Sequence, residues 1–136
     1  LILPNLEQGA WVLCDRFADS SRAYQGAASG VDDGVFDALD RIVVGENQPE
    51  LTIIIDLPVD IAMKRVAARQ QQDGLEVDRF ESENMQFHER LRAGFLKIAA
   101  ANAKRCIIID GNQSREKVAE LVWQTVAERF GLEDVV

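Results

Sequence analysis

The sequence predicts a single α/β domain in which helices cover both faces of a parallel sheet. Two apolar runs rich in β-branched residues, "LTIIIDL" at 51–57 and "CIII" at 106–109, are typical of parallel strands buried on both faces. Helical segments lie between the runs, and strands that alternate with helices indicate parallel pairing through crossover connections. The length of 136 residues fits one domain, 1–136, with a sizeable core.

Strands are expected at three places along the chain. Residues 1–9 resemble the end of a helix that stops at Gly9, and the apolar run at 11–14 follows as the first strand. The runs at 51–57 and 106–109 are the second and third strands. Because the chain lacks an initiator Met and opens part-way through a helical pattern, we expect it to be a fragment of a longer protein.

Four amphipathic helices are predicted around these strands, at 33–44, 58–71, 82–102 and from Ser114 onward. The first can be capped by Asp32 or Asp33 and is stopped by Gly45 and Pro49. The apolar positions expected to face inward are Phe87, Leu91, Phe95 and Ile98 in the third helix and Val118, Leu121, Val122 and Val126 in the last. Further residues interpreted as core are Trp11, Met63, Met85 and Trp123, with His88 as a partly buried packing residue.

One polar segment, "RQQQDGLEVDRFESE" at 69–83, joins two helices without a strand between them. In α/β proteins a helix–polar loop–helix insertion is often a lid over the site. A plain solvated helical hairpin would have the same composition, so both interpretations stay open at this point.

Composition and charge exclude some partners. The net charge of −8 disfavours a surface for nucleic acid, although an acidic protein can still hold an arginine-lined pocket for a small anion. No apolar run approaches the roughly 18 residues of a membrane span, so no membrane partner is expected. Cys14 and Cys106 lie in apolar runs without CxxC spacing and are interpreted as buried free thiols of a cytoplasmic protein.

The stretch "LCDRFADSSRAYQG" at 13–26 concentrates polar side chains directly after the first predicted strand. In open α/β sheets ligands bind at the carboxyl ends of the strands, which makes this segment a candidate binding site. Arg16 offers a planar fork that can hold a monophosphate through two hydrogen bonds. An ion pair with Asp15 or Asp19 is the alternative for the same side chain.

These residues resemble the thymidylate kinase family. "LCDRFADSSRAYQ" at 13–25 matches the family signature without a mismatch, and three further blocks match in order: "PELTIIIDLPVDIAMKR" at 49–65, "DRFESE" at 78–83 and "IIIDGNQSREKV" at 107–118. The resemblance covers essentially the whole chain. It implies a P-loop NTPase-like three-layer sandwich with a parallel sheet and a helical lid, and a reaction in which the γ-phosphoryl of ATP passes to dTMP with Mg²⁺.

The chain departs from the family pattern at its beginning, where the first strand and the GxxxxGK[ST] phosphate loop have no counterpart. We therefore expect the 136-residue chain alone to lack kinase activity. Two alternatives stay open: another nucleoside or nucleotide kinase of the same fold, or a non-catalytic α/β fragment that acts in binding or dimerisation.

The resemblance implies catalytic roles for the first polar residues of the motif. Asp15 corresponds to the family carboxylate that faces Mg²⁺ and the phosphoryl path, and Arg16 to the arginine that clamps the dTMP phosphate. Ser20 and Ser21 correspond to positions near the base and the phosphate, where a hydroxyl can donate and accept hydrogen bonds. Each serine could instead cap the following helical turn.

Two later residues of the motif are implied to contact the nucleoside. Tyr24 corresponds to the aromatic residue beside the sugar, whose bulk would exclude a 2′-hydroxyl by a clash. Gln25 could pair with a pyrimidine edge through its amide. Core packing for Tyr24 and a solvent-facing position for Gln25 are the alternatives.

Other charged residues are implied to act at the lid and on ATP. Arg79 corresponds to a lid arginine that meets the transferred phosphoryl, unless Asp78 and Glu81 form a capping box and leave it solvated. Glu81 is expected near the sugar or metal, among the substrate-binding residues. Arg65 and Arg69, one helical turn apart, are expected to flank ATP together with Arg79, with a solvated helix face as the alternative for Arg65 and Arg69.

The partners that follow are dTMP, ATP and a second copy of the chain. Family members usually pair as homodimers through helices beside the sheet, and the predicted helix at 33–44 carries enough apolar residues to contribute. A helix that simply covers the sheet would have the same pattern.

Overall fold

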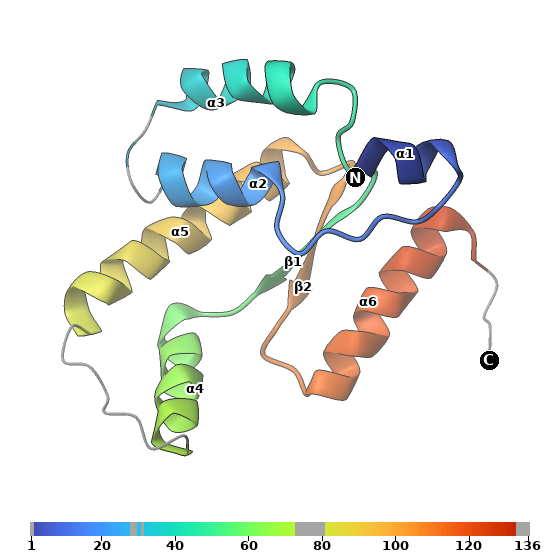
Figure 1. The fold of residues 1–136 in the computed structure, drawn as a ribbon. Helices are drawn as coiled ribbons and strands as arrows, with labels where there is room; N and C mark the ends of the chain where they lie inside the picture. The colour runs from blue at the N-terminus through green and yellow to red at the C-terminus, as the bar shows by residue number, and fades with distance from the viewer. Residues whose placement is uncertain (1, 28–29, 31, 73–80, 133–136) are drawn as a thin grey trace.

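A computed structural model describes residues 2–27, 30, 32–72 and 81–132 of the chain (Figure 1). Its elements, in chain order, are α1 (Ile2–Glu7), α2 (Ala18–Ser21), η1 (Arg22–Ala27), α3 (Asp33–Leu39), η2 (Asp40–Val44), β1 (Thr52–Asp56), α4 (Val59–Gln72), α5 (Glu81–Ala101), β2 (Cys106–Asp110) and α6 (Arg115–Phe130). The segments η1 and η2 are π-helical turns. The four predicted helices and the second and third predicted strands are therefore confirmed.

Strands β1 and β2 pair in parallel, from Thr52 opposite Cys106 to Asp56 opposite Asp110. The predicted parallel pairing is confirmed, and the connection between the strands passes through α4 and α5. Because parallel strands end at the same edge of a sheet, the two aspartates lie side by side at the carboxyl edge.

Helices α5 and α6 pack on opposite sides of the strand pair, which gives a three-layer arrangement (Figure 1). The core is centred on Ala23, Leu91 and Ile98, with Tyr24, Phe87 and Phe95 packed against them. The predicted inward stripe of α5 is therefore confirmed, and His88 is half-buried beside the ring of Phe87 as expected. The predicted inward positions of α6 are half-buried: Val118, Leu121, Val122 and Val126.

The start of α6 at Ser114, predicted from the sequence, is confirmed. Ser114 accepts a hydrogen bond from the backbone N–H of Lys117 at 3.2 Å, as an N-cap serine does. Asp32 caps α3 in the same way, with its carboxylate accepting from Gly34 N at 2.8 Å. Both helices thus begin where their polar side chains satisfy an otherwise unpaired backbone donor.

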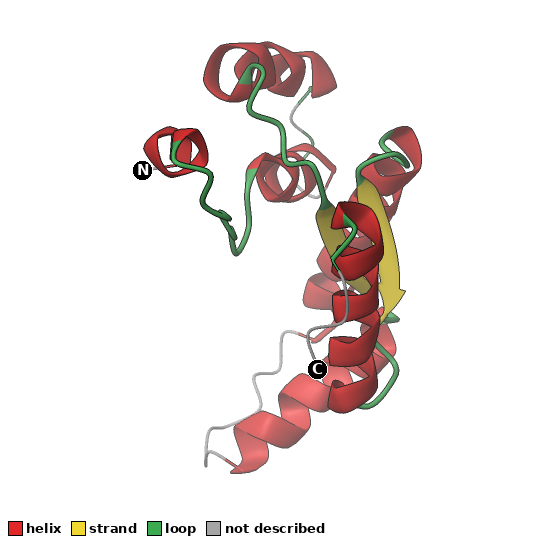
Figure 2. Cartoon of the chain, turned by 90° about the vertical axis from the view of Figure 1, so that its right-hand side faces the viewer, coloured by secondary structure: helices red, strands yellow, loops and turns green. Residues whose placement is uncertain are grey.

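The prediction of a strand at 11–14 is wrong. The segment is a loop, and Figure 2 shows it leaving the first helix and running apart from the two strands. Trp11 and Leu13 are 66% and 100% exposed, and the Cys14 thiol is exposed as well. A strand needs a neighbour that shares its hydrogen-bond ladder, and no strand pairs with 11–14 within the described residues.

Several apolar residues interpreted as core are also exposed: Trp11, Met85 and Trp123. The ring of Trp11 instead lies edge-on against Phe130 of α6, at 4.8 Å between centroids. Of the two free thiols only Cys106 is buried, and burial raises the pKa of its thiol. An apolar side chain is buried only where another layer covers it, and the sequence does not say where that layer lies.

The predicted helix at 33–44 is helical throughout but changes from α to π geometry at Asp40, and it ends at Gly45 with φ +54°. Phe36 and Val44 are buried. The other apolar side chains of this helix are exposed: Val35, Leu39, Ile42 and Val43. The helix therefore presents an apolar surface to solvent instead of covering the sheet (Figure 1).

The polar segment at 69–83 falls partly outside the described residues, which omit 73–80. What is described are its two flanks, the end of α4 and the beginning of α5.

Within the described part of the chain, no helix is both long enough and apolar enough to span a membrane.

Candidate functional site

The backbone at Arg16 is unusual. Its φ of +69° lies in the left-handed region, and no other described residue except glycine has a positive φ. For a side chain with a Cβ this conformation costs roughly 1–3 kcal/mol, and it persists only where the surroundings impose it. Such residues concentrate at functional sites, which makes Arg16 a candidate on structural grounds as well as by sequence.

Arg16 and Tyr24, predicted separately from the sequence, come together in the structure. The Arg16 guanidinium carbon lies over the Tyr24 ring, 5.0 Å from its centroid. Tyr24 is held in turn by α5, where Phe87 and Phe95 each lie 6.3 Å from it, the latter edge-on. A cation over an aromatic face at an exposed site contributes about 0.5–1 kcal/mol. The pair thus gives a flexible arginine a defined position.

The structure does not show the alternative for Arg16, an ion pair with Asp15 or Asp19. Among the described residues Arg16 has no ion pair, and Asp19 is bound by Arg105 instead. Asp15, next to Arg16, is exposed. The guanidinium is therefore available to an anion while it stays stacked on Tyr24.

Ser20 and Ser21 are the last two residues of α2, so neither is its N-cap. The N-cap is Phe17, which makes no side-chain cap hydrogen bond. Ser20 is half-buried, whereas Ser21 and Gln25, four positions apart, are exposed. The opposite side of this helical segment is buried at Ala23 and Gly26. One side therefore packs on the core while the other presents polar side chains.

An unpredicted arginine ties this segment to its neighbour. Arg22 donates to Asp37 at 2.8 Å and to Asp40 at 3.2 Å, joining η1 to α3 and η2. The sequence signal was a charged residue in a free position of the motif, but its partners lie 15 and 18 residues away. The π-helical geometry of η1, which is rare and often found at functional sites, begins at this residue.

A second unpredicted ion pair lies at the carboxyl edge of the sheet. Arg92 of α5 donates to both oxygens of Asp56, at 2.7 and 2.8 Å. These hydrogen bonds, opposed by partial burial, hold the pKa of the Asp56 carboxyl below its ordinary value of 3.8. The pair anchors α5 to the end of β1.

This pair predicts an acid dependence of stability. Because the Asp56 pKa is lower in the folded chain, the pair stabilises the fold above the ordinary carboxyl pKa, and the contribution is lost as pH falls through the folded pKa. Urea unfolding of wild type and Asp56→Asn should therefore give free energies that differ at neutral pH and converge in acid. Glu120→Gln, in an exposed pair of α6, serves as the control. A gap that stays constant with pH would contradict the assignment.

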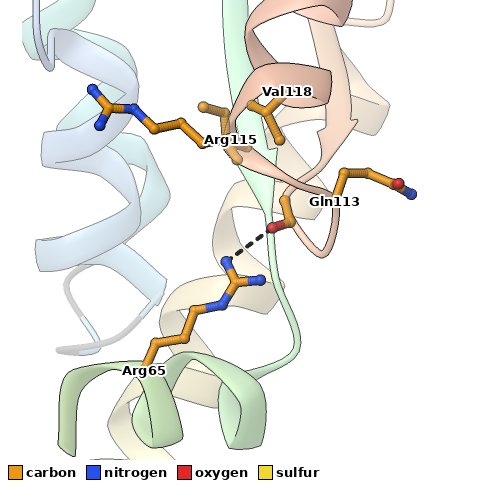
Figure 3. A pocket seen from close by; sticks show the side chains of 6 residues that line it. Arg65, Gln113, Arg115 and Val118 are labelled. Carbon is orange, nitrogen blue, oxygen red and sulfur yellow. Dashed lines mark hydrogen bonds between the residues drawn. The ribbon is translucent and has the colours of Figure 1, made fainter. Parts of the chain in front are cut away.

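A cavity of about 430 Å³ lies beyond the carboxyl end of the strands, lined by Ile55, Arg65, Gly111, Gln113, Arg115 and Val118. Figure 3 shows Arg65 of α4 reaching the Gly111 carbonyl, to which it donates at 3.1 Å. The side chains of Gln113 and Arg115 extend away from this contact in opposite directions (Figure 3). Arg65 is thus placed at the cavity with part of its fork committed to the backbone.

The turn that forms the cavity wall is held by Asp110. Its carboxylate accepts from Asn112 N at 2.8 Å and from the Gln113 amide at 2.9 Å, and these hydrogen bonds lower the pKa of Asp110. Gly111 N donates to the Asp56 carbonyl at 2.7 Å. A Cβ at Gly111 would lie only 2.9 Å from that carbonyl oxygen, so the turn needs glycine.

The remaining predicted residues are placed only in part. Arg69 is exposed on α4, one turn beyond Arg65, and does not line the cavity. Arg79 and the side chain of Glu81 lie outside the described residues. In the part of the chain that is described, no three His, Cys, Asp or Glu side chains gather into a group that could hold a metal ion.

Comparison with known proteins identifies relatives over nearly the whole chain. The family model described as thymidylate kinase matches residues 1–122. The thymidylate kinase of Bradyrhizobium sp. (strain ORS 278) is 48% identical over 130 residues, which are 96% of this chain and 57% of that protein. The thymidylate kinase of Nitrobacter hamburgensis is 47% identical over 98% of this chain and 57% of its own length.

A solved structure with a similar fold also comes from a thymidylate kinase. The crystal structure of thymidylate kinase from Ehrlichia chaffeensis superposes with a TM-score of 0.68 at 30% identity, covering 93% of this chain and 55% of that one. The chain thus spans about 57% of the length of these curated relatives.

Proposed function

Because the chain belongs to the thymidylate kinase family, we propose that the full-length protein transfers the γ-phosphoryl of ATP to dTMP and so produces dTDP. The observation that supports this most directly is the Arg16–Tyr24 stack, which lies inside the segment that carries the family signature. The strained φ at Arg16 supports the same conclusion, because the cost of such a backbone is retained where a side chain must be aimed.

In this proposal the acceptor nucleotide lies along the exposed side of α2 and η1. Arg16 holds the 5′-phosphate of dTMP with two charge-assisted hydrogen bonds. Tyr24, fixed by Phe87 and Phe95, limits the space beside the sugar and disfavours a 2′-hydroxyl. The hydroxyls of Ser20 and Ser21 and the amide of Gln25 read the base or phosphate, in line with their half-buried or exposed positions.

ATP is proposed to use the cavity beyond β2. The cavity is open, contains the Arg65 guanidinium and is bordered by the backbone of the turn after Asp110, which suits an adenine ring or a polyphosphate. Arg69 is proposed to contribute from the next turn of α4, and Arg79 to meet the transferred phosphoryl. Residues 1–136 contain no GxxxxGK[ST] loop, so the proposal assigns the phosphate cradle of the full-length protein to a segment outside them.

Asp15 is the proposed magnesium-binding residue. Its exposed carboxylate next to Arg16 fits Mg²⁺, which in kinases is held by one or two carboxylates together with substrate phosphates. Mg²⁺ supplies neutralisation of phosphate charge when bound. Asp15 would orient it beside the dTMP phosphate held by Arg16, and Glu81 is proposed to lie near the same sugar or metal.

The protein is further proposed to be a homodimer and to be located in the cytoplasm. The exposed apolar side chains of α3 and η2, including Ile42 at 82% exposure, form the surface proposed to meet a second copy. Both cysteines are free thiols, as expected for a reducing compartment.

The proposal is tested by the substrate preference of the full-length protein. With ATP and Mg²⁺, kcat/KM for dTMP is expected to exceed that for UMP by roughly 10²-fold or more. Thymidine is included to separate a nucleotide kinase from a nucleoside kinase, and dCMP to test base selection. Equal or better turnover of UMP or thymidine would contradict the assignment of dTMP as the acceptor.

A further inference from the structure

Asp19 lies in the stretch at 13–26 that carries the family signature, but it is not one of the site residues predicted there. Its two carboxylate oxygens accept hydrogen bonds from Arg105, at 2.6 and 2.8 Å, in a bidentate ion pair. The two side chains are only 14% and 19% exposed. A pair of this geometry and burial holds its partners in a defined orientation, unlike an exposed single contact.

Arg105 and Thr52 connect this carboxylate to the sheet. Arg105 also donates to the Thr52 hydroxyl at 3.0 Å, and Thr52 in turn donates to Asp19 at 3.4 Å. Thr52 is the first residue of β1, and its backbone N–H donates to the Arg105 carbonyl at 2.8 Å. Arg105 directly precedes β2. The three residues therefore join α2 to the amino-terminal ends of both strands.

Helix α2 needs such an anchor. It has four residues and no side-chain N-cap, and a helix this short is not stable without tertiary contacts. Arg16, three positions before Asp19, has a backbone conformation that persists only if its surroundings hold it. The next ion pair along the chain starts at Arg22 and leads to α3 and η2, so it does not tie α2 to the sheet.

We infer that Asp19, Arg105 and Thr52 form a positioning anchor that fixes α2 on the sheet and thereby aims Arg16 over Tyr24 at the acceptor nucleotide. The anchor does not touch the nucleotide. It acts through the backbone between Arg16 and Asp19, and it is attached at the amino-terminal edge of the sheet. The inference rests on the proposed function only in its statement of what Arg16 binds.

The anchor is tested in the full-length protein with two conservative variants. Asp19→Asn keeps the size of the side chain and removes its charge, whereas Arg105→Lys keeps the charge and removes the planar fork. Thr52→Ser, which retains the hydroxyl, is a variant expected to behave as wild type. Glu120→Gln breaks the exposed Lys117–Glu120 pair of α6 and is the matched control for loss of an ion pair.

Two readouts separate positioning from general stability. In both anchor variants kcat/KM for dTMP should fall roughly 10- to 100-fold, as expected for a misplaced binding group, while KM for ATP stays within about twofold. Hydrogen–deuterium exchange measured by mass spectrometry should rise in peptides covering 13–26 and stay unchanged in α6. Glu120→Gln should change neither value.

The outcomes are distinguishable. Unchanged exchange at 13–26 in both variants, or a rise spread evenly over the chain, would overturn the anchor. The anchor would also be overturned if kcat/KM for dTMP in both anchor variants stayed within about twofold of wild type while the protein remained active. If wild type itself does not phosphorylate dTMP, the proposed function fails, and the exchange measurement alone then decides whether the anchor orders the segment.

Discussion

Replacing Arg16 with alanine in the full-length protein is expected to lower kcat/KM for dTMP by at least about 10²-fold, because the two proposed charge-assisted hydrogen bonds to the phosphate, each of roughly 1.5–3 kcal/mol, would be lost. The loss should not come from unfolding, since the Arg16 side chain is exposed and its described contact is the stack on Tyr24. Steady-state kinetics with varied dTMP at saturating ATP measure the effect. Arg90→Ala, at an exposed arginine of α5, is the control.

Two further substitutions at the same position separate charge, shape and backbone strain. Arg16→Lys keeps the charge but not the planar fork, so its activity should lie between those of wild type and Arg16→Ala. Arg16→Gly should be as inactive as Arg16→Ala but more stable than it, because glycine adopts a φ of +69° without a steric cost. A fall in kcat/KM of less than about threefold in Arg16→Ala would rule out the phosphate-binding role.

Replacing Gly111 with alanine is expected to reduce both stability and ATP use. The new Cβ would lie 2.9 Å from the Asp56 carbonyl oxygen and 2.9 Å from Ile55 Cγ2, so backbone of β1 or of the turn must move. Such overpacking typically costs about 1–3 kcal/mol. The movement would also displace the Gly111 carbonyl that accepts from Arg65 and would reshape the cavity, so KM for ATP should rise.

Gly131→Ala is the matched control for this substitution. Gly131 ends α6 with φ +61°, and a Cβ added there would meet no atom within 4 Å, so alanine costs about 1 kcal/mol through backbone conformation alone. Thermal unfolding should therefore detect both variants, whereas only Gly111→Ala should change KM for ATP. If the KM for ATP is the same in the two variants, the cavity after β2 is not the ATP site.

Features that depend on a few neighbouring residues were predictable from the sequence. The helix caps at Asp32 and Ser114 act on backbone donors two or three positions away, so the local residue pattern contains all the information they need. The inward stripe of α5 and the β-branched run of β1 are equally local, since they follow from the helical and strand repeats. Arg16 was a candidate because it follows an apolar run and has a planar fork, and Tyr24 was a candidate through the resemblance of the motif to the thymidylate kinase family.

The tertiary structure decided which of these local features have partners. The run at 11–14 has strand-forming residues, yet it is a loop because no strand lies beside it in the described chain. Arg105 meets Asp19 across 86 positions and Arg92 meets Asp56 across 36, and nothing in either local sequence specifies the other. Such pairs depend on how the helices α2 and α5 pack on the ends of the strands, because that tertiary arrangement places charges distant in the sequence within hydrogen-bond distance of each other.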